Sequence, residues 1–269
     1  GLSGHLGMTY NPYDKSHTRL VGGSSCGSAA ATAAGIVPFA LGSDTGDSVR
    51  KPASLAGLVG FKPTWSRISR FGLFPFAPSL DTVGYFARNV MDIAIVTEAL
   101  AGRDERDATS SAQPVEKYTE NLKISCKSSR IAVIKEVIDS VSDEDVKAAF
   151  AKSIDGLRAK GFVVEEVSVP KAILESLLPT YFVISCAEAT SNNANLDGIK
   201  FGPLSNGETY EEVMANARTV GFGELIKRRF VIGSFALMKE NKNDLFIRAQ
   251  KNRRRIVDMI NNILSKYDF

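Results

Sequence analysis

Two serines lie in segments made largely of glycine, alanine and serine, and both could act as nucleophiles. Ser24 follows two glycines in the segment Gly22–Gly35, and Ser48 lies 24 residues further on in Leu41–Ala53. Small residues at this density let backbone approach other backbone, or a ligand, closely. A hydroxyl at a strand-to-helix turn, with free backbone N–H groups around it, suits attack on a carbonyl group and stabilisation of the resulting oxyanion.

Three other kinds of site could explain a block rich in glycine and serine, and the sequence argues against each. A phosphate-binding loop would have GxxxxGK[ST] or GxGxxG, and neither occurs. Gly23–Gly27 matches the GxSxG elbow with Ser25 as nucleophile, but that fold has its histidine after the serine, whereas His5 and His17 precede it. Ser48–Lys51 matches SxxK, but the accompanying SDN and KTG elements are missing. Serine–lysine chemistry without histidine remains.

The block as a whole, from Gly22 to Arg50 with Pro52, resembles the amidase-signature family, including the spacing between its two serines. The match continues through Gly57–Thr64 and Ser79–Gly84. The resemblance implies that Ser48 is the nucleophile and forms an acyl-enzyme. It also implies that Ser24 follows a cis peptide bond and relays a proton between the nucleophile and a lysine.

The same resemblance assigns an oxyanion hole and several supporting residues. The oxyanion hole is expected from the backbone N–H groups of Thr45, Gly46, Asp47 and Ser48. Asp44 and Arg50 are expected to form a structural pair under this turn. We expect the hydroxyl groups of Ser25 and Ser28 to bind backbone atoms.

The chain departs from the family pattern at three points. The family's lysine lies upstream of the serine block, and the chain, which looks trimmed at both ends, starts too late to contain it. The possible substitutes, none of which sits where the family places its base, are Lys15, Lys51 and Lys62. Cys26 stands where the family has glycine or serine. Asp47 stands where glycine is common, so its carboxylate should turn away from a developing oxyanion.

Residues outside the general signature are most similar to the A subunits of aspartyl/glutamyl-tRNA amidotransferases. They include Asn11–Asp14, Gly102–Asp104, Asp107–Ser110, Pro179–Ile184, Gly221–Phe230 and Gly233–Leu237. The resemblance implies a glutaminase that releases ammonia for amidation of mischarged Glu-tRNA(Gln) or Asp-tRNA(Asn). It places Arg229 and Tyr181 at the glutamine site, with the guanidinium facing the α-carboxylate.

This resemblance also implies partners and cofactors. It implies B and C subunits, tRNA reached through the complex rather than directly, and ATP and Mg²⁺ on a partner subunit. No cofactor or metal is expected on this chain, and no membrane. A stand-alone amidase acting on small amides is the alternative. A third possibility, an inactive scaffold or nucleic-acid binder, would use the basic residues Lys251 and Arg253–Arg255, for which a solvated helix face is favoured.

Composition agrees with an intracellular globular protein. The 269 residues are 44% hydrophobic and 23% charged, and the net charge of +3 indicates no strong field for nucleic acid or membrane. Cys26, Cys126 and Cys186 are far apart and form no CxxC, which argues against a disulfide framework or zinc site and favours the reducing cytoplasm. No uninterrupted apolar run reaches the roughly 18 residues of a membrane span.

The elements that must position the serines predict an α/β class. The resemblance specifies an amidase-signature fold with a mixed central sheet covered by helices on both faces. Residues 1–110 are expected to hold the signature core with the serine block, and residues 111–269 the remainder of the same domain. Gly102–Ser111 is polar and indicates a surface loop. Pro38–Leu41 predicts a strand, and Ser48–Arg50 the start of a helix.

Further along the chain, the pattern predicts a strand–helix–strand unit with parallel strands. Arg130–Ile134 indicates a short buried strand, and 162–169 a second strand. Between them, Ser142 is the expected helix cap, with Asp145 in capping-box position. The apolar stripe is Val146, Phe150, Ile154 and Leu157, and Gly161 ends the helix. A further amphipathic helix is expected to begin near Asp244.

Overall fold

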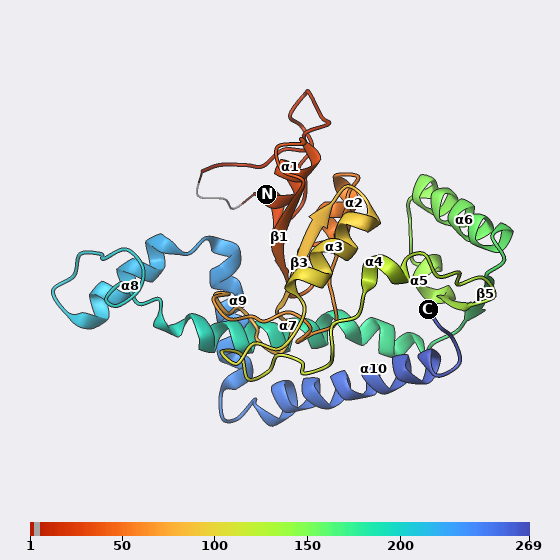
Figure 1. Cartoon of the computed structure of the whole chain (residues 1–269). Coiled ribbons are helices and arrows are strands. Elements are labelled where there is room, and N and C mark those ends of the chain that lie inside the picture. The colour runs from red at the N-terminus through yellow and green to blue at the C-terminus, as the bar shows by residue number, and fades with distance from the viewer. Residues whose placement is uncertain (3–5) are drawn as a thin grey trace. The chain divides into compact units, whose positions relative to one another are not determined.

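The computed structural model describes residues 1–2 and 6–269, so His5 lies outside the described part of the chain. Figure 1 shows the chain with its helices and strands labelled. Contacts between residues divide the chain into two compact units. The first unit combines Gly1–Lys123 with Ser185–Phe235, and the second combines Ile124–Ile184 with Ala236–Phe269. The domain organisation expected from composition, residues 1–110 and 111–269, stays a prediction.

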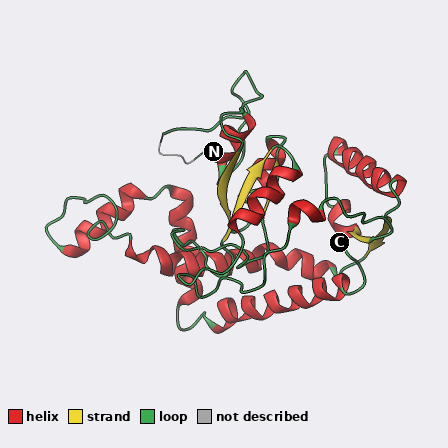
Figure 2. Cartoon of the chain, viewed as in Figure 1, coloured by secondary structure: helices red, strands yellow, loops and turns green. Residues whose placement is uncertain are grey.

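Figure 2 shows the strands in yellow among the red helices. The first unit contains a three-stranded antiparallel sheet in the order β1-β3-β2. Its strands are β1 (Phe39–Asp44), β2 (Val59–Phe61) and β3 (Thr82–Ala87). The central strand β3 is buried along almost its whole length, as its β-branched and aromatic residues favour. In the register, Asp44 lies opposite Thr82, so the carboxyl end of β1 lies beside the start of β3.

Helices follow or precede each of these strands. The helical elements of this unit are α1 (Cys26–Ala33), α2 (Arg50–Leu55), α3 (Val90–Leu100), α4 (Tyr118–Asn121), α7 (Lys171–Asn192) from Ser185 onward, η1 (Asn193–Asn195), α8 (Tyr210–Gly221) and, up to Phe235, α9 (Glu224–Leu237). The strand expected at Pro38–Leu41 and the helix expected after Ser48 are therefore both present. Asn89 caps α3 by accepting a hydrogen bond from the Asp92 N–H at 2.8 Å.

The core beside the serine block is small and tightly packed. It consists of Val21, Ala29, Val49, Ala53, Ala56 and Phe86, with Cys26 among the partly buried residues against it. A Cβ atom on Gly60 would lie 2.4 Å from the Cβ of Ala53, so only glycine lets α2 pack directly on β2. This packing fixes the position of the turn that carries Ser48.

The second unit contains the predicted strand–helix–strand arrangement. Strand β4 (Arg130–Ile134) pairs in parallel with β5 (Val163–Val167), and Arg130 lies opposite Val163. The helical elements of this unit are α5 (Lys135–Asp139), α6 (Glu144–Ala159), the first part of α7 (Lys171–Asn192), η2 (Asn243–Ile247) and α10 (Arg248–Leu264). The α/β class is confirmed, with antiparallel and parallel pairing present in two separate sheets.

Three details of this unit differ from the prediction. Asp143, not Ser142, caps α6, because its carboxylate accepts from the Val146 N–H at 3.0 Å while its own backbone is extended. Strand β4 is exposed at Arg130 and only partly buried beyond it, because its sheet has two strands. The last helix opens with the π-helical turn η2 before α10. Gly161 follows the end of α6 with a φ of +93°, as expected.

Helix α7 belongs to both units, since the division falls between Ile184 and Ser185. By length and composition, the helical stretch Lys171–Asn195 is apolar enough to cross a membrane, with a mean hydropathy of 1.3. Its residues Ile184, Cys186, Ala187 and Ala189 are buried within the folded chain. Core helices of folded domains share this composition, so the stretch gives only weak evidence for a membrane span.

Candidate active site

The two candidate serines lie on neighbouring turns. The N–H of Ser25 donates to the carbonyl oxygen of Ser48 at 3.2 Å, which joins the turn before α1 to the turn before α2. The Gly23–Ser24 peptide bond is cis, as the family resemblance implies. Ser24 is exposed and Ser48 is partly buried. Backbone hydrogen bonding thus joins the turns that carry Ser24 and Ser48, which lie 24 positions apart in the sequence, and the catalytic roles of the two serines stay predictions.

The other serines of the block bind backbone atoms, as predicted. The Ser25 hydroxyl donates to the carbonyl oxygen of Ser43 and accepts from the Ser43 N–H, both at 3.2 Å. The Ser28 hydroxyl donates to the carbonyl oxygen of Leu41 at 2.7 Å. A Cβ atom on Gly42 would lie 2.7 Å from the Ser25 oxygen, so glycine is needed where α1 approaches β1. These contacts fasten the Ser24 turn to the end of β1.

The turn between β1 and α2 carries donors that the fold does not use. Among the residues that the structure describes, no acceptor binds the backbone N–H groups of Thr45, Gly46, Asp47 or Ser48. Unused N–H groups just before a helix are well suited to bind a developing oxyanion. Their role as an oxyanion hole stays a prediction, and this geometry is compatible with it.

Asp44 and Arg50 form the predicted structural pair beneath this turn. Nη2 of Arg50 lies 2.9 Å from Oδ1 of Asp44, whose side chain is fully buried. The same carboxylate accepts from the backbone N–H groups of Val49 and Arg50 at 3.0 and 3.3 Å. Burial opposes ionisation of Asp44, but the hydrogen bonds and charge of Arg50 outweigh it and lower the pKa of the carboxyl group. The pair therefore joins the end of β1 to the start of α2 beneath the turn.

The Asp47 carboxylate turns outward, as its position requires. It forms an ion pair with Lys51 at 2.8 Å, and both side chains are about half exposed, at 56% and 49%. Lys62 Nζ donates to the carbonyl oxygen of Pro63 at 3.0 Å, and burial, together with nearby Arg50, lowers the pKa of its ammonium group. Within the described chain, neither lysine donates to the hydroxyl of Ser24 or Ser48.

Asp81 is a site residue that local sequence patterns do not reveal. Its side chain is only 3% exposed. Oδ1 accepts from the Thr45 hydroxyl at 2.5 Å, and Oδ2 accepts from the N–H groups of Phe76 and Ala77, both at 2.9 Å. The match to Ser79–Gly84 marks the segment, but the contact depends on β3 starting beside the end of β1.

The predicted substrate-binding residues lie in different units. Arg229, on α9, is half-buried in the first unit, and its guanidinium carbon lies 5.8 Å from the centre of the Phe76 ring. Phe76 belongs to the loop that Asp81 joins to Thr45, so Arg229 is not a simple surface charge. Tyr181 lies in the second unit, where its ring packs edge-on against Phe182 with centroids 5.6 Å apart. Both roles stay predictions.

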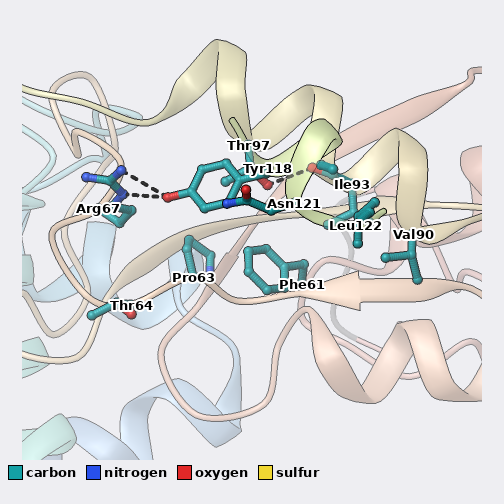
Figure 3. Close-up of a pocket in the computed structure, with 11 residues that line it drawn as sticks. Phe61, Pro63, Thr64, Arg67, Val90, Ile93, Thr97, Tyr118, Asn121 and Leu122 are labelled. Atoms are coloured by element: carbon teal, nitrogen blue, oxygen red, sulfur yellow. Dashed lines mark hydrogen bonds between the residues drawn. The ribbon is translucent and has the colours of Figure 1, made fainter. Parts of the chain in front are cut away.

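A cavity of about 410 Å³ lies elsewhere in the first unit (Figure 3). Phe61 of β2, Ile93 and Thr97 of α3, and Tyr118 of α4 line it. Figure 3 shows Arg67 donating to the Tyr118 hydroxyl, at 3.1 and 2.9 Å. None of its lining residues belongs to the serine block. The cavity is therefore distinct from the candidate active site.

Comparison with known proteins gives a consistent result. The family model described as Amidase matches residues 2–269. The chain is 44% identical over 261 residues to the A subunit of glutamyl-tRNA(Gln) amidotransferase from Staphylococcus saprophyticus, covering 97% of this chain and 53% of that protein. The corresponding protein of Thermotoga maritima has a crystal structure that matches with a TM-score of 0.77 and 39% identity, covering 97% of this chain and 52% of that one.

A third relative is described in connection with s-triazine catabolism rather than with tRNA. An inhibitor-bound structure, described as a vestigial protein complex that reveals the origins of an s-triazine catabolic enzyme, matches with a TM-score of 0.79 and 31% identity. That match covers 98% of this chain and 51% of the other. The chain thus spans about half the length of the relatives it matches.

Proposed function

Because the chain belongs to the Amidase family, we propose that it carries the two serines of a glutamine amidohydrolase. The protein would be the A subunit of a tRNA-dependent amidotransferase, releasing ammonia for the amidation of mischarged Glu-tRNA(Gln) or Asp-tRNA(Asn). The single observation that carries this proposal is the 44% identity, over 97% of the chain, to the A subunit of a glutamyl-tRNA(Gln) amidotransferase. The joined Ser24 and Ser48 turns supply a compatible geometry.

In the proposed mechanism, Ser48 Oγ attacks the side-chain amide carbon of glutamine. Ser24 takes up the Ser48 proton and passes it to a lysine, and the unused N–H groups of residues 45–48 stabilise the tetrahedral oxyanion. The intermediate collapses when the C–N bond breaks, and the nitrogen leaves as ammonia after receiving the proton. Water then attacks the acyl-enzyme ester, which releases glutamate and restores Ser48.

The partners follow from the same proposal. B and C subunits would assemble with this protein, and the B subunit would receive the ammonia. The tRNA would be reached through the complex, ATP and Mg²⁺ would bind a partner subunit, and the complex would be cytoplasmic. The names of the relatives support an amidotransferase complex. Arg229 would hold the α-carboxylate of glutamine, and Tyr181 is the second residue proposed to bind substrate.

The test uses the intact protein in complex with its partners. Ser48→Ala should abolish glutamine hydrolysis and acyl-enzyme formation, and Ser24→Ala should lower turnover by several orders of magnitude. Because the members of one relay act as a unit, the double variant should be little worse than Ser48→Ala. Ser54→Ala is the matched control, since that serine is exposed on α2. Losses that multiply in the double variant would rule out the relay.

A stand-alone amidase acting on small amides is the second candidate. The observation in its favour is that a crystal structure described only as an amidase matches with a TM-score of 0.68 and 28% identity, covering 93% of this chain and 49% of that one. The chemistry of Ser24 and Ser48 would be the same in both. Copurification of a partner, and glutamine hydrolysis that increases with partner and tRNA, would support the amidotransferase. Rapid hydrolysis of small aliphatic amides without partners would support the alternative.

A further inference from the structure

The Thr45 side chain is held by the Asp81 carboxylate, which is itself held by several hydrogen bonds. Its hydroxyl donates to Asp81 Oδ1 at 2.5 Å. Threonine is β-branched, so a fixed hydroxyl oxygen also restricts the rotation of the side chain about the Cα–Cβ bond. The Cα atom and the adjacent N–H group of Thr45 are then oriented as well. This N–H is one of the unused donors of the turn.

Asp81 is rigid because its carboxylate closes the loop in which it lies. Oδ2 accepts from the N–H groups of Phe76 and Ala77, both at 2.9 Å. The Ala77 carbonyl oxygen in turn accepts from the N–H groups of Leu80 and Asp81, both at 2.8 Å. A buried carboxylate needs several donors to offset its lost hydration, and the loop supplies them. The carboxylate therefore has little freedom to leave Thr45.

Helix α7 anchors the same loop from a distant part of the sequence. Oε2 of Glu188 accepts from the Ser79 N–H at 3.0 Å, and Oε1 accepts from the Ser79 hydroxyl at 2.5 Å. Asn192 Nδ2 donates to the Phe76 carbonyl oxygen at 3.3 Å. All of these residues belong to the first unit. Glu188 thus holds Ser79, which lies two residues before Asp81 in the loop, and Asp81 in turn holds Thr45.

We propose that Asp81 is a positioning residue that orients the Thr45 N–H toward the oxyanion through the Thr45 hydroxyl. It touches neither substrate nor reacting atoms. The inference rests on the proposed role of residues 45–48 as the oxyanion hole. Asp81 keeps a donor aligned before the reaction begins, so the turn does not have to reorganise as negative charge develops.

The experiment measures how fast a fluorophosphonate labels Ser48 in the intact protein, together with kcat and KM for glutamine. Thr45→Val removes only the hydroxyl, because valine keeps the shape and the backbone N–H. Removing a whole oxyanion donor lowers rates by about 10²–10³-fold, so a donor that is retained but misaligned should lower labelling and kcat by about 10-fold. KM should change by less than about twofold, because the ground-state contacts of glutamine are unchanged.

Further variants separate positioning from general stability. Thr45→Ser keeps the hydroxyl and should recover labelling to within about threefold of wild type. Asp81→Ala removes the acceptor and should impair labelling at least as much as Thr45→Val, and the double variant should be no worse than the more impaired single variant, because both substitutions remove the same hydrogen bond. Thr82→Val is the matched control, since it removes a neighbouring buried hydroxyl that donates only to the Leu80 carbonyl. Melting temperatures confirm that each variant is folded.

The outcomes distinguish this proposal from the proposed function. Wild-type labelling rates in folded Thr45→Val, losses that multiply in the double variant, or a serine variant as slow as the valine variant would each overturn the positioning role. If wild-type protein is labelled at Ser48 but does not hydrolyse glutamine, the substrate assignment fails and the labelling rates still decide the role of Asp81. Wild-type protein that is not labelled at Ser48 overturns both.

Discussion

The guanidinium of Arg229 lies at the edge of the loop that carries Asp81, and its predicted role is specific to one substrate. Glutamine has an α-carboxylate, whereas simple aliphatic amides do not. Arg229→Ala in the assembled complex should therefore weaken kcat/KM for glutamine by about 2–4 kcal/mol, the range for losing a charge-assisted partner in a desolvated site. Arg229→Lys should recover only part of this loss, because an ammonium group lacks the bidentate fork.

Arg228→Ala provides the matched control for Arg229. It removes the same side chain one position away, where Arg228 is 69% exposed and pairs with Glu224 at 3.4 Å. This variant should hydrolyse glutamine normally. With added ammonium in place of glutamine, Arg229→Ala should amidate the mischarged tRNA as fast as wild type, because ammonium bypasses Ser48. If Arg229→Ala has the wild-type kcat/KM for glutamine, the α-carboxylate of glutamine is bound elsewhere, and the small-amide alternative gains support.

Some side-chain contacts of the site follow from local sequence, and others do not. The pairing of Asp44 with Arg50, and the backbone contacts of Ser25 and Ser28, were predicted, because their partners lie within one block of small residues. The contact between Asp81 and Thr45 spans 36 positions and depends on the register of β1 against β3. Local sequence patterns do not specify that register, so this contact is found only in the structure.

At the scale of elements, Asp44 joins the end of β1 to the start of α2. Asp44→Asn removes the charge that Arg50 compensates and places an NH2 donor against either the Arg50 guanidinium or the N–H groups of Val49 and Arg50. Breaking a buried ion pair costs about 3–5 kcal/mol, but the Arg50 side chain is 50% exposed, so we expect a loss of about 2 kcal/mol in unfolding free energy at pH 7. Denaturant titration measures this loss.

The contribution of Asp44 to the free energy of unfolding should decrease as the pH falls. Its pKa is lowered in the folded chain, so the stabilisation is complete above the unfolded pKa of about 3.9 and is lost as the pH falls through the folded value. The difference between wild type and Asp44→Asn should therefore shrink below about pH 4. Asp47→Asn, which alters an exposed pair in the same turn, should change stability by less than about 0.5 kcal/mol. An equal loss in both variants would contradict the structural role of the pair between Asp44 and Arg50.

The existence and pairing of strands β4 and β5 can be predicted from the sequence, whereas the cap of α6 and the burial of β4 cannot. Strands β4 and β5 and their parallel pairing follow from apolar runs flanking an amphipathic helix. The cap of α6 was misplaced by one residue, because Ser142 and Asp143 are both good capping residues and backbone geometry chooses between them. The burial of β4 was overestimated, since an apolar pattern does not reveal how many strands share a sheet.

At the scale of the whole molecule, the first unit is built from two separated stretches of chain, and this predicts how the protein responds to a single cut. Residues 121–128 are exposed and include Lys123 and Lys127, so brief trypsin treatment should nick the chain there. The segment Ser185–Phe235 would then be on the second fragment, yet its Glu188 still binds Ser79 on the first. The two fragments should therefore complement each other without a covalent link. They should elute together in gel filtration and separate only in denaturant, whereas separation in native buffer would show that the first unit does not hold the two stretches together.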